Sequence, residues 1–295
     1  MKKNIDSLDT LAILSIEDIS SIVNRTIKAT WSGAENRSLA QRAALIMESK
    51  GICGTVNGSE DYPAMLGTIS DLPYAVFYRG NLDVLSKKCV SVVGTRRICR
   101  ETAQAAMEFS RDAADNGQAV VSGLAEGIDT FAHKGALESD SDGTTVAVLP
   151  CGIESVVPYS NRGLAGQILR QGGLVCSEYI PGVPAEPWRF LQRNRLIAAL
   201  SSATVVIQAP KGSGALVTAD FALAYNRDLM FHEAGFCEEA RKKGSFVKES
   251  KSKAPDAQWY VSEGAPIIEN YASYVRVMES PPGTYGIKDR QLELF

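Results

Sequence analysis

The stretch Cys89-Val90-Ser91-Val92-Val93-Gly94-Thr95-Arg96-Arg97 joins a short apolar run to a glycine and two arginines. Such β-branched runs are typical of strands that are buried on both faces of a parallel sheet. A helical pattern follows over 101–116 and ends at Gly117, a common C-terminal cap. A strand that turns through glycine and arginine into a helix forms an anion site, because the first helical N–H groups are unpaired and guanidinium groups add forked donors. The same sequence is also compatible with an ordinary tight turn whose arginines are only solvated, so both interpretations stay open at this point.

Strands and helices alternate on both sides of this stretch, from about residue 75 to residue 235. The predicted strands are 75–78, 89–93, 118–121, 144–149, 174–177, 203–208 and 229–232, and the predicted helices are 101–116, 129–138, 161–170, 194–200 and 215–225. Alternation of this kind predicts an α/β fold with a doubly wound, mostly parallel sheet. Ligands of such sheets bind beyond the carboxyl ends of the strands, so the turns that follow the strands are the candidate sites.

The rest of the chain is assigned from its composition. Residues 1–70 predict a small helical N-terminal domain, with apolar residues at helical spacing from Leu11 to Ile22 and a helix over 38–50. Residues 71–280 form the α/β domain, in which 240–258 is expected to be an exposed lysine-rich and serine-rich loop and 261–278 a final strand and helix. Residues 281–295 are expected to be a tail.

Composition excludes several classes of protein. The 295 residues carry a net charge of −3, which leaves room for a local basic groove but not for a surface that is basic throughout. The six cysteines form no C-x-x-C pair and there are two histidines, so we expect reduced thiols, no metal site and no cofactor. No apolar run reaches the roughly 18 residues of a membrane span. The sequence therefore predicts a cytoplasmic protein that does not interact with membranes.

Four loops at the predicted strand ends share one chemical character. Each supplies glycine N–H groups, hydroxyls or cationic side chains, and all four are expected at the same edge of the sheet. In sequence order they contain Gly94-Thr95-Arg96-Arg97, Ser122-Gly123, Arg193-Asn194-Arg195 and Lys211-Gly212-Ser213-Gly214. Together they predict a cradle for phosphate groups.

Six motifs in this order resemble the DprA/Smf family of DNA-processing proteins. They are Val-Val-Gly-Thr-Arg-Arg (92–97), Ser-Gly-Leu-Ala-x-Gly-Ile-Asp-Thr-x-Ala-His-x-Gly-Ala-Leu (122–137), Ala-Val-Leu-Pro-Cys-Gly-Ile (147–153), Ser-Glu-Tyr (177–179), Arg-Asn-Arg-Leu-Ile-Ala (193–198) and Ser-Gly-Ala-Leu-Val-Thr-Ala (213–219). The resemblance covers about residues 62–275. It implies an extended Rossmann-like domain that binds single-stranded DNA without strong sequence preference. It also implies a homodimer that protects incoming DNA during natural transformation in competent cells and helps load the RecA recombinase for DNA recombination.

The resemblance also implies roles for individual residues. Gly94, Thr95 and Arg96 would hold backbone phosphates with help from Ser122 and Gly123, and Arg193, Asn194 and Arg195 would shape and charge the same pocket. Arg97 and Lys211 complete the predicted DNA-binding set, and Tyr179 is a candidate platform for an unstacked base, although it also fits an ordinary half-buried tyrosine.

This sequence departs from the family pattern at several positions. Glu126 replaces a basic residue, Leu191-Gln192 stands where a proline is common, and Glu233-Ala234-Gly235 replaces Val-Pro-Gly. The acidic replacements bear on DNA affinity more than on the fold. Because about fifteen residues follow Glu279, the C-terminal winged-helix module of many family members is expected to be absent.

Other functions fit the motifs less well. Asp129 and His133 share a helix face near Ser122, but the strained elbow that a serine hydrolase requires is missing, so we expect no catalysis. Gly212-x-Gly214 opens a helix as nucleotide-binding loops do, which keeps a nucleotide-binding protein related to phosphoribohydrolases as the alternative. Hydrolysis is disfavoured because Val217 stands where the catalytic glutamate of those enzymes is found. A lysine run from Lys242 to Lys253 also fits an interaction scaffold or a solvated loop.

Overall fold

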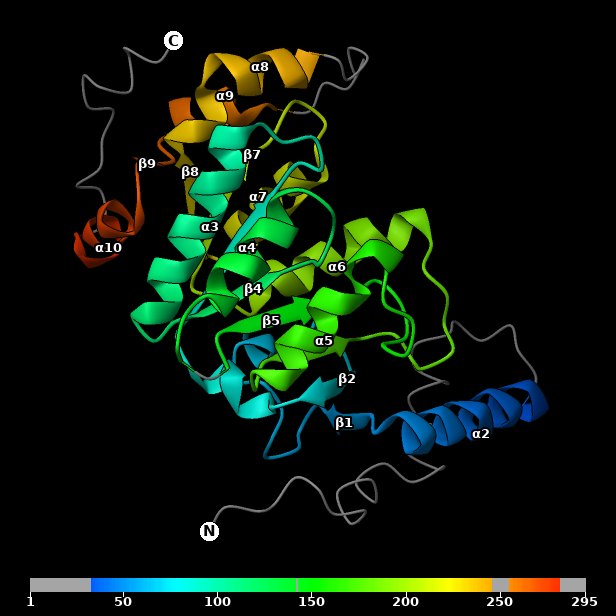
Figure 1. The fold of residues 1–295 in the computed structure, drawn as a ribbon. Coiled ribbons are helices and arrows are strands. Elements are labelled where there is room, and N and C mark those ends of the chain that lie inside the picture. The colour runs from blue at the N-terminus through cyan, green and yellow to red at the C-terminus, as the bar shows by residue number, and fades with distance from the viewer. Residues whose placement is uncertain (1–32, 142, 246–254, 282–295) are drawn as a thin grey trace.

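Nine strands form one sheet in the part of the chain that the computed structural model describes, residues 33–141, 143–245 and 255–281 (Figure 1). In chain order they are β1 (Cys53–Val56), β2 (Ala75–Gly80), β3 (Cys89–Gly94), β4 (Ala119–Ser122), β5 (Thr145–Val148), β6 (Leu174–Ser177), β7 (Ala203–Gln208), β8 (Asp228–His232) and β9 (Ile267–Ile268). Their order across the sheet is β1-β2-β6-β5-β4-β3-β7-β8-β9. The seven strands from β6 to β9 pair in parallel, whereas β1 and β2 are antiparallel at one edge. The predicted α/β fold with a mostly parallel sheet is confirmed.

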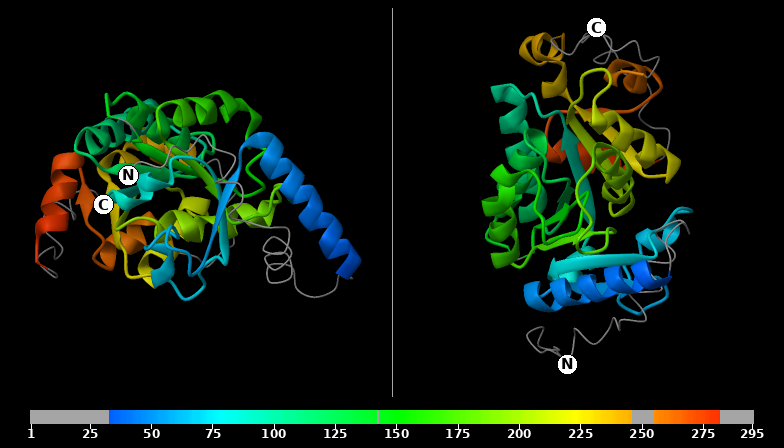
Figure 2. Two further views of the ribbon diagram at one scale, coloured as in Figure 1. Left: turned by 90° about the horizontal axis from the view of Figure 1, so that it is seen from below. Right: turned by 90° about the vertical axis from the view of Figure 1, so that its right-hand side faces the viewer.

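Helices cover both faces of the sheet (Figure 2). One face packs against α3 (Arg100–Asp115), α4 (Ile128–Leu137), α5 (Arg162–Arg170) and α10 (Tyr271–Glu279), and the other against α6 (Pro187–Ala199), α7 (Gly214–Ala224) and α9 (Ala257–Ser262). Strand β3 shows the alternation that this arrangement requires. Val90 and Val92 enter the core beneath α3 and α4, while Cys89 and Val93 enter the core beneath α6 and α7.

Helix α6 begins seven residues earlier than predicted, at Pro187 instead of residue 194. Glu186 is its N-cap and Pro187 occupies the first turn, where a missing N–H costs nothing. The first turns carry exposed residues such as Trp188 and Leu191, so no apolar periodicity marks them in the sequence. Arg193 therefore belongs to the helix, together with Asn194 and Arg195, and not to the loop before it.

The N-terminal part of the described chain contributes to the same sheet. Helix α2 (Gly33–Lys50) contains the predicted helix over 38–50, and Ala40, Ala43 and Met47 on it pack against β2. Strand β1 lies within the range that was expected to be helical and pairs with β2. A strand of only four residues has too few alternating apolar and polar positions to be distinguished from a loop in the sequence. The residues from Leu11 to Ile22 lie outside the described residues, and the division at residues 70/71 stays a prediction.

The C-terminal segments differ from the expected loop. Helix α8 (Glu238–Ser245) carries Lys242 and Lys243, which pair with Glu238 and Glu239 one turn earlier. Lys248, Lys251 and Lys253 lie outside the described residues. Four short 3-10 helices complete the described elements: η2 (Leu66–Thr68), η3 (Leu82–Ser86), η4 (Tyr159–Asn161) and η5 (Glu233–Phe236). Within the ranges given above, no helix has the length and apolar character needed to cross a membrane.

Candidate anion-binding site

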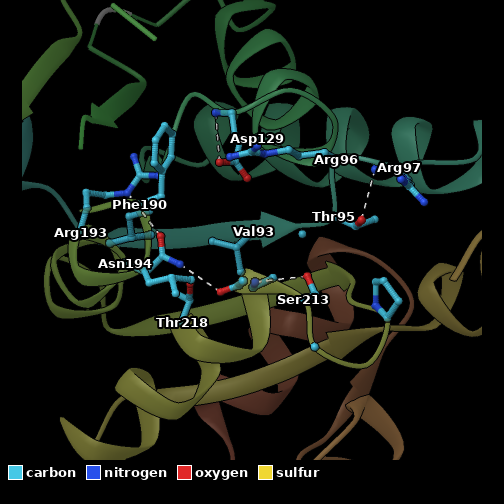
Figure 3. Close-up of a pocket in the computed structure, with 18 of the residues that line it drawn as sticks. Val93, Thr95, Arg96, Arg97, Asp129, Phe190, Arg193, Asn194, Ser213 and Thr218 are labelled. Carbon is cyan, nitrogen blue, oxygen red and sulfur yellow. Dashed lines mark hydrogen bonds between the residues drawn. The ribbon is translucent and has the colours of Figure 1, made fainter. Parts of the chain in front are cut away.

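A cavity of about 640 Å³ opens at the carboxyl ends of β3 and β7 (Figure 3). The helix that follows β3 covers one face of the sheet and the helix that follows β7 covers the other, so the cavity lies at the topological switch point between these two parallel strands. This is the place at which open α/β sheets bind ligands. We call it the strand-end cavity. Its walls are the β3–α3 turn (93–97), Ala125 and Asp129, one side of α6 (187, 190, 191, 193, 194 and 197) and the start of α7 with its preceding loop (210–215 and 218).

The β3–α3 turn is held by its backbone and leaves its cationic side chains exposed. The Thr95 N–H donates to the Gln208 carbonyl at 2.8 Å, and the Thr95 carbonyl accepts from the Ile128 N–H at 3.2 Å. The Arg97 N–H donates to Thr95 Oγ1 at 3.2 Å. A rigid backbone therefore presents the exposed side chains of Arg96 and Arg97 at the rim.

The loop before α7 forms the opposite wall. Gly212 has a φ of +77°, which is a left-handed conformation that glycine adopts without strain. Ser213 is the N-cap of α7 and its Oγ accepts from the Ala215 N–H at 3.3 Å. Lys211 and Gly212 are exposed beside this helix N-terminus, whose partial positive charge favours an anion.

Arg193 is a buried charge next to the strand-end cavity. Its Nη1 donates to the carbonyls of Gly123, at 2.8 Å, and Val148, and its Nε donates to Asn194 Oδ1 at 3.3 Å. Burial lowers the pKa of Arg193 to about 10, and the nearby carboxylate of Asp129 opposes that shift. The guanidinium is thus committed to protein carbonyls, and it contributes a fixed positive charge to the wall.

Asp129 and Asn194 hold neighbouring parts of the wall together. Asp129 is buried and its Oδ2 accepts from the Ala125 N–H at 3.3 Å; burial raises its pKa, and the charge of Arg193 opposes the shift. Asn194 Nδ2 donates to the Gly214 carbonyl at 3.0 Å and thereby joins α6 to the start of α7. Seven of the eleven predicted DNA-binding residues line the strand-end cavity: Gly94, Thr95, Arg96, Arg97, Arg193, Asn194 and Lys211.

Ser122 and Gly123 lie behind the wall and not in it. Ser122 is fully buried and its Oγ donates to the Val92 carbonyl at 2.7 Å. A Cβ atom on Gly123 would lie 2.6 Å from Arg193 Nη2 and 2.7 Å from Asp129 Oδ2. Both residues therefore lie behind the cavity wall, and the position of Gly123 leaves no room for a side chain.

Tyr179 and Arg195 are also outside the strand-end cavity. Tyr179 is 7% exposed, and its hydroxyl donates to Gln192 Oε1 at 2.9 Å, so its ring is not free to stack on a base. Arg195 is paired with the buried carboxylate of Glu178 and donates to the Asp71 carbonyl at 2.8 Å. Residues two positions apart on a helix point in nearly opposite directions, so Arg193 and Arg195 cannot serve the same wall.

Phe190 lines the cavity although no motif in the sequence marks it. Its ring lies 5.4 Å from Arg96 Cζ, a cation–π distance, and Figure 3 shows it facing into the cavity region. The segment Trp188-Arg189-Phe190 mixes aromatic and basic residues, which is a signal for nucleic-acid binding. Because the segment was read as a loop, that signal was missed.

The geometry does not support the two catalytic alternatives, a serine hydrolase and a nucleotide hydrolase. His133 Nδ1 lies 2.7 Å from Thr145 Oγ1, while the Ser122 hydroxyl donates to a carbonyl, so no nucleophile–base pair forms between them. Within α7, Thr218 lines the cavity and Val217 does not, and neither side chain carries a carboxylate for hydrolysis.

Comparisons with known proteins agree with the motifs. A family model described as DNA recombination-mediator protein A matches residues 54–274. Protein Smf from Borreliella burgdorferi is 33% identical over 224 residues, which cover 76% of this chain and 70% of that protein. The matches to the next three curated relatives cover between 43% and 58% of their lengths.

Two solved structures share the fold and part of the sequence. DNA processing protein A from Streptococcus pneumoniae aligns over 98% of this chain and all of its own, with a TM-score of 0.69 and 25% identity. DNA processing protein A from Helicobacter pylori, which binds single-stranded DNA, aligns over 77% of this chain and 95% of its own, with a TM-score of 0.62 and 26% identity.

Proposed function

The chain belongs to the DNA recombination-mediator protein A family, also called DprA/Smf, and from this we propose that it binds single-stranded DNA in the strand-end cavity. One observation supports this proposal most directly. An open cavity at a helix N-terminus is lined by Arg96 and Arg97 on one wall and by Lys211 on the other. The Helicobacter pylori relative binds single-stranded DNA, which supports the same ligand here. We further propose that the protein acts as a recombination mediator without catalysing a reaction.

Phosphate contacts and base stacking have separate places in this proposal. Arg96, Arg97 and Lys211, together with the N–H groups of the loop before α7, would bind successive backbone phosphates. Phe190 replaces Tyr179 as the proposed platform for an unstacked base, because its ring lines the cavity. Neither contact reads a base edge, so binding is expected to depend little on sequence.

The wider role follows from the family. We propose that the protein protects incoming single strands during natural transformation, acts as a homodimer and helps load the RecA recombinase. The same cavity supports nucleotide binding as a second candidate, because Ser213 and Gly214 begin a helix in the way that phosphate-binding loops do.

One binding experiment separates these two ligands. Fluorescence anisotropy of a labelled oligothymidine is measured at low and moderate salt, with duplex DNA, ATP or NAD as competitor. We expect salt-sensitive binding that duplex DNA and nucleotides compete for poorly. Failure to bind the oligonucleotide, together with tight nucleotide binding, would assign the cavity to a small ligand.

Replacing Arg96 tests the phosphate contact. Arg96→Ala is expected to weaken the binding of oligothymidine and of mixed-sequence oligonucleotides equally, by about tenfold. It should also reduce the slope of log K against log salt by about 0.7. Arg42→Ala, which removes an exposed arginine on α2 at the far edge of the sheet, is the matched control and is expected to bind normally. Equal binding by both variants would argue against the strand-end cavity as the DNA site.

Replacing Phe190 tests the stacking contact separately. Phe190→Leu keeps an apolar side chain but removes the π-face, so affinity is expected to fall about tenfold while the salt slope stays unchanged. Trp188→Leu removes an exposed aromatic residue that does not line the cavity and should bind as the unaltered protein does. A changed salt slope in Phe190→Leu would mean that the substitution disturbs Arg96 instead of a stacked base.

A further inference from the structure

Two cysteines that are 138 positions apart in the sequence meet beside the turn that carries Arg96 and Arg97. The Sγ atoms of Cys99 and Cys237 are 3.9 Å apart. One ligand atom from each of Cys99, Cys237 and Glu101 lies within 4.8 Å of the others. Cys99 is buried, Cys237 is half-buried and Glu101 is exposed, and neither cysteine is in a disulfide.

Each cysteine stands at the start of a helix. Cys99 is the N-cap of α3; its N–H donates to Thr102 Oγ1 at 3.2 Å, and its sulfur lies 3.3 Å from the same oxygen. Cys237 directly precedes α8: its carbonyl accepts from the Arg241 N–H at 3.1 Å and its sulfur from the Ala240 N–H at 3.4 Å. Oxygen-bearing residues are preferred at N-caps, so capping does not require sulfur at either position.

Burial raises the pKa of the Cys237 thiol, and the helix termini around the two sulfurs act against that effect. The N-terminal ends of α3 and α8 meet here, and the positive end of a helix dipole stabilises negative charge. N–H groups that donate to sulfur are the supporting contacts that orient thiolate ligands. Glu101, in the first turn of α3, adds an oxygen ligand on the exposed side.

The spacing of the ligands fits a tetrahedral cation better than a disulfide. Two sulfurs bound to zinc at about 2.3 Å with tetrahedral angles are roughly 3.8 Å apart. A disulfide would require the two sulfurs to approach to about 2.05 Å. We propose that Cys99, Cys237 and Glu101 form a binding site for a thiophilic divalent cation of the zinc class.

Such a site would join the β3–α3 turn to α8. A second contact already joins them, since Lys243 Nζ donates to the Ile98 carbonyl at 2.6 Å. A bound cation would therefore restrict the turn on which Arg96 and Arg97 are presented. The sequence does not predict this site, because Cys99 and Cys237 come from separate segments and have none of the short spacings that mark metal ligands in a sequence. The proposal does not depend on DNA binding.

Cobalt titration of the reduced protein, kept free of oxygen, tests the site. Co²⁺ is expected to produce a sulfur-to-metal charge-transfer band that saturates at one equivalent and disappears when Zn²⁺ is added. Zn²⁺ is also expected to raise the melting temperature. Absence of the band from protein whose thiols titrate as reduced would overturn the proposal, and so would isolation of the protein with a Cys99–Cys237 disulfide that persists under mild reductant.

Serine variants separate metal binding from folding. Cys99→Ser and Cys237→Ser retain a good N-cap, so both are expected to fold, and each should weaken Co²⁺ binding by more than roughly a hundredfold. Glu101→Gln should weaken it by about tenfold while keeping the band. Cys53→Ser and Glu238→Gln are the matched controls and should bind as the unaltered protein does. Equal binding by Cys237→Ser and Cys53→Ser would show that the metal is held elsewhere.

Discussion

Gly127→Ala is expected to lower the free energy of unfolding by about 3 kcal/mol and the melting temperature by roughly 6–12 °C. Gly127 is the N-cap of α4 and has φ of +82° and ψ of −132°, a conformation that only glycine adopts freely. A Cβ atom there would lie 2.6 Å from the Arg96 Cα atom and closer still to the Thr95 carbonyl oxygen. Both neighbours are backbone atoms, so no side-chain rotation can relieve the contact.

The same substitution is expected to weaken DNA binding, because the displaced atoms belong to the β3–α3 turn. Gly117→Ala is the matched control: its φ is +77°, but a Cβ atom there would meet nothing within 4 Å. That variant should lose only about 1 kcal/mol from the strained dihedral and should bind DNA normally. Chemical unfolding and anisotropy, both measured well below the melting temperatures, provide the two readouts. Equal losses in both variants would show that the turn moves aside without cost.

The sequence predicted the parallel part of the fold because its signals are local. The run from Cys89 to Val93, the capping Gly117 and the helices predicted over 101–116 and 129–138 all appear where they were expected. Strand β1 and the start of α6 were missed for the opposite reason. Their residues pair or pack with distant segments, and neither carries a periodic pattern long enough to be recognised alone.

The candidate site was predicted in its composition but only partly in its geometry. The order of the loops along a parallel sheet places Gly94, Arg96 and Lys211 at one edge, and the structure brings them together. The direction of a side chain on a helix is a different question. Arg193 and Arg195 look equivalent in the sequence, yet one lines the strand-end cavity and the other pairs with Glu178.

The two histidines of this chain are expected to make the folded state sensitive to mild acid. His133 is fully buried, and burial lowers its pKa to about 3. Its Nδ1 lies 2.7 Å from Thr145 Oγ1, and that hydroxyl donates to the Val120 carbonyl, so Nδ1 must carry the proton while the buried Nε2 has no partner. Burial also lowers the pKa of His232 to about 4, and its Nδ1 accepts from the Ala234 N–H at 3.2 Å.

The sign follows from where the protons bind. Well above pH 6.5, the ordinary pKa of an unfolded histidine, both rings are neutral in both states and their contribution to stability is complete. Below pH 6.5 the histidines of the unfolded chain bind protons, whereas those of the folded chain do not. Each histidine then costs about 1.4 kcal/mol of stability per pH unit, until the pH reaches its folded pKa. Between pH 6.5 and 5.0 the two together remove about 3 kcal/mol.

Buried carboxyl groups act in the opposite direction, so the histidine contribution is measured by difference. The pKa values of Asp129 and Glu178 are raised by burial, and their folded forms therefore gain stability in acid. His232→Asn keeps an acceptor near the position of Nδ1 but cannot titrate. Denaturant unfolding of both proteins from pH 7.5 to 5.0 should give a curve for the variant that is flatter by about 1.4 kcal/mol per pH unit below pH 6.5. Parallel curves would mean that His232 binds its proton equally well in the folded and unfolded chains.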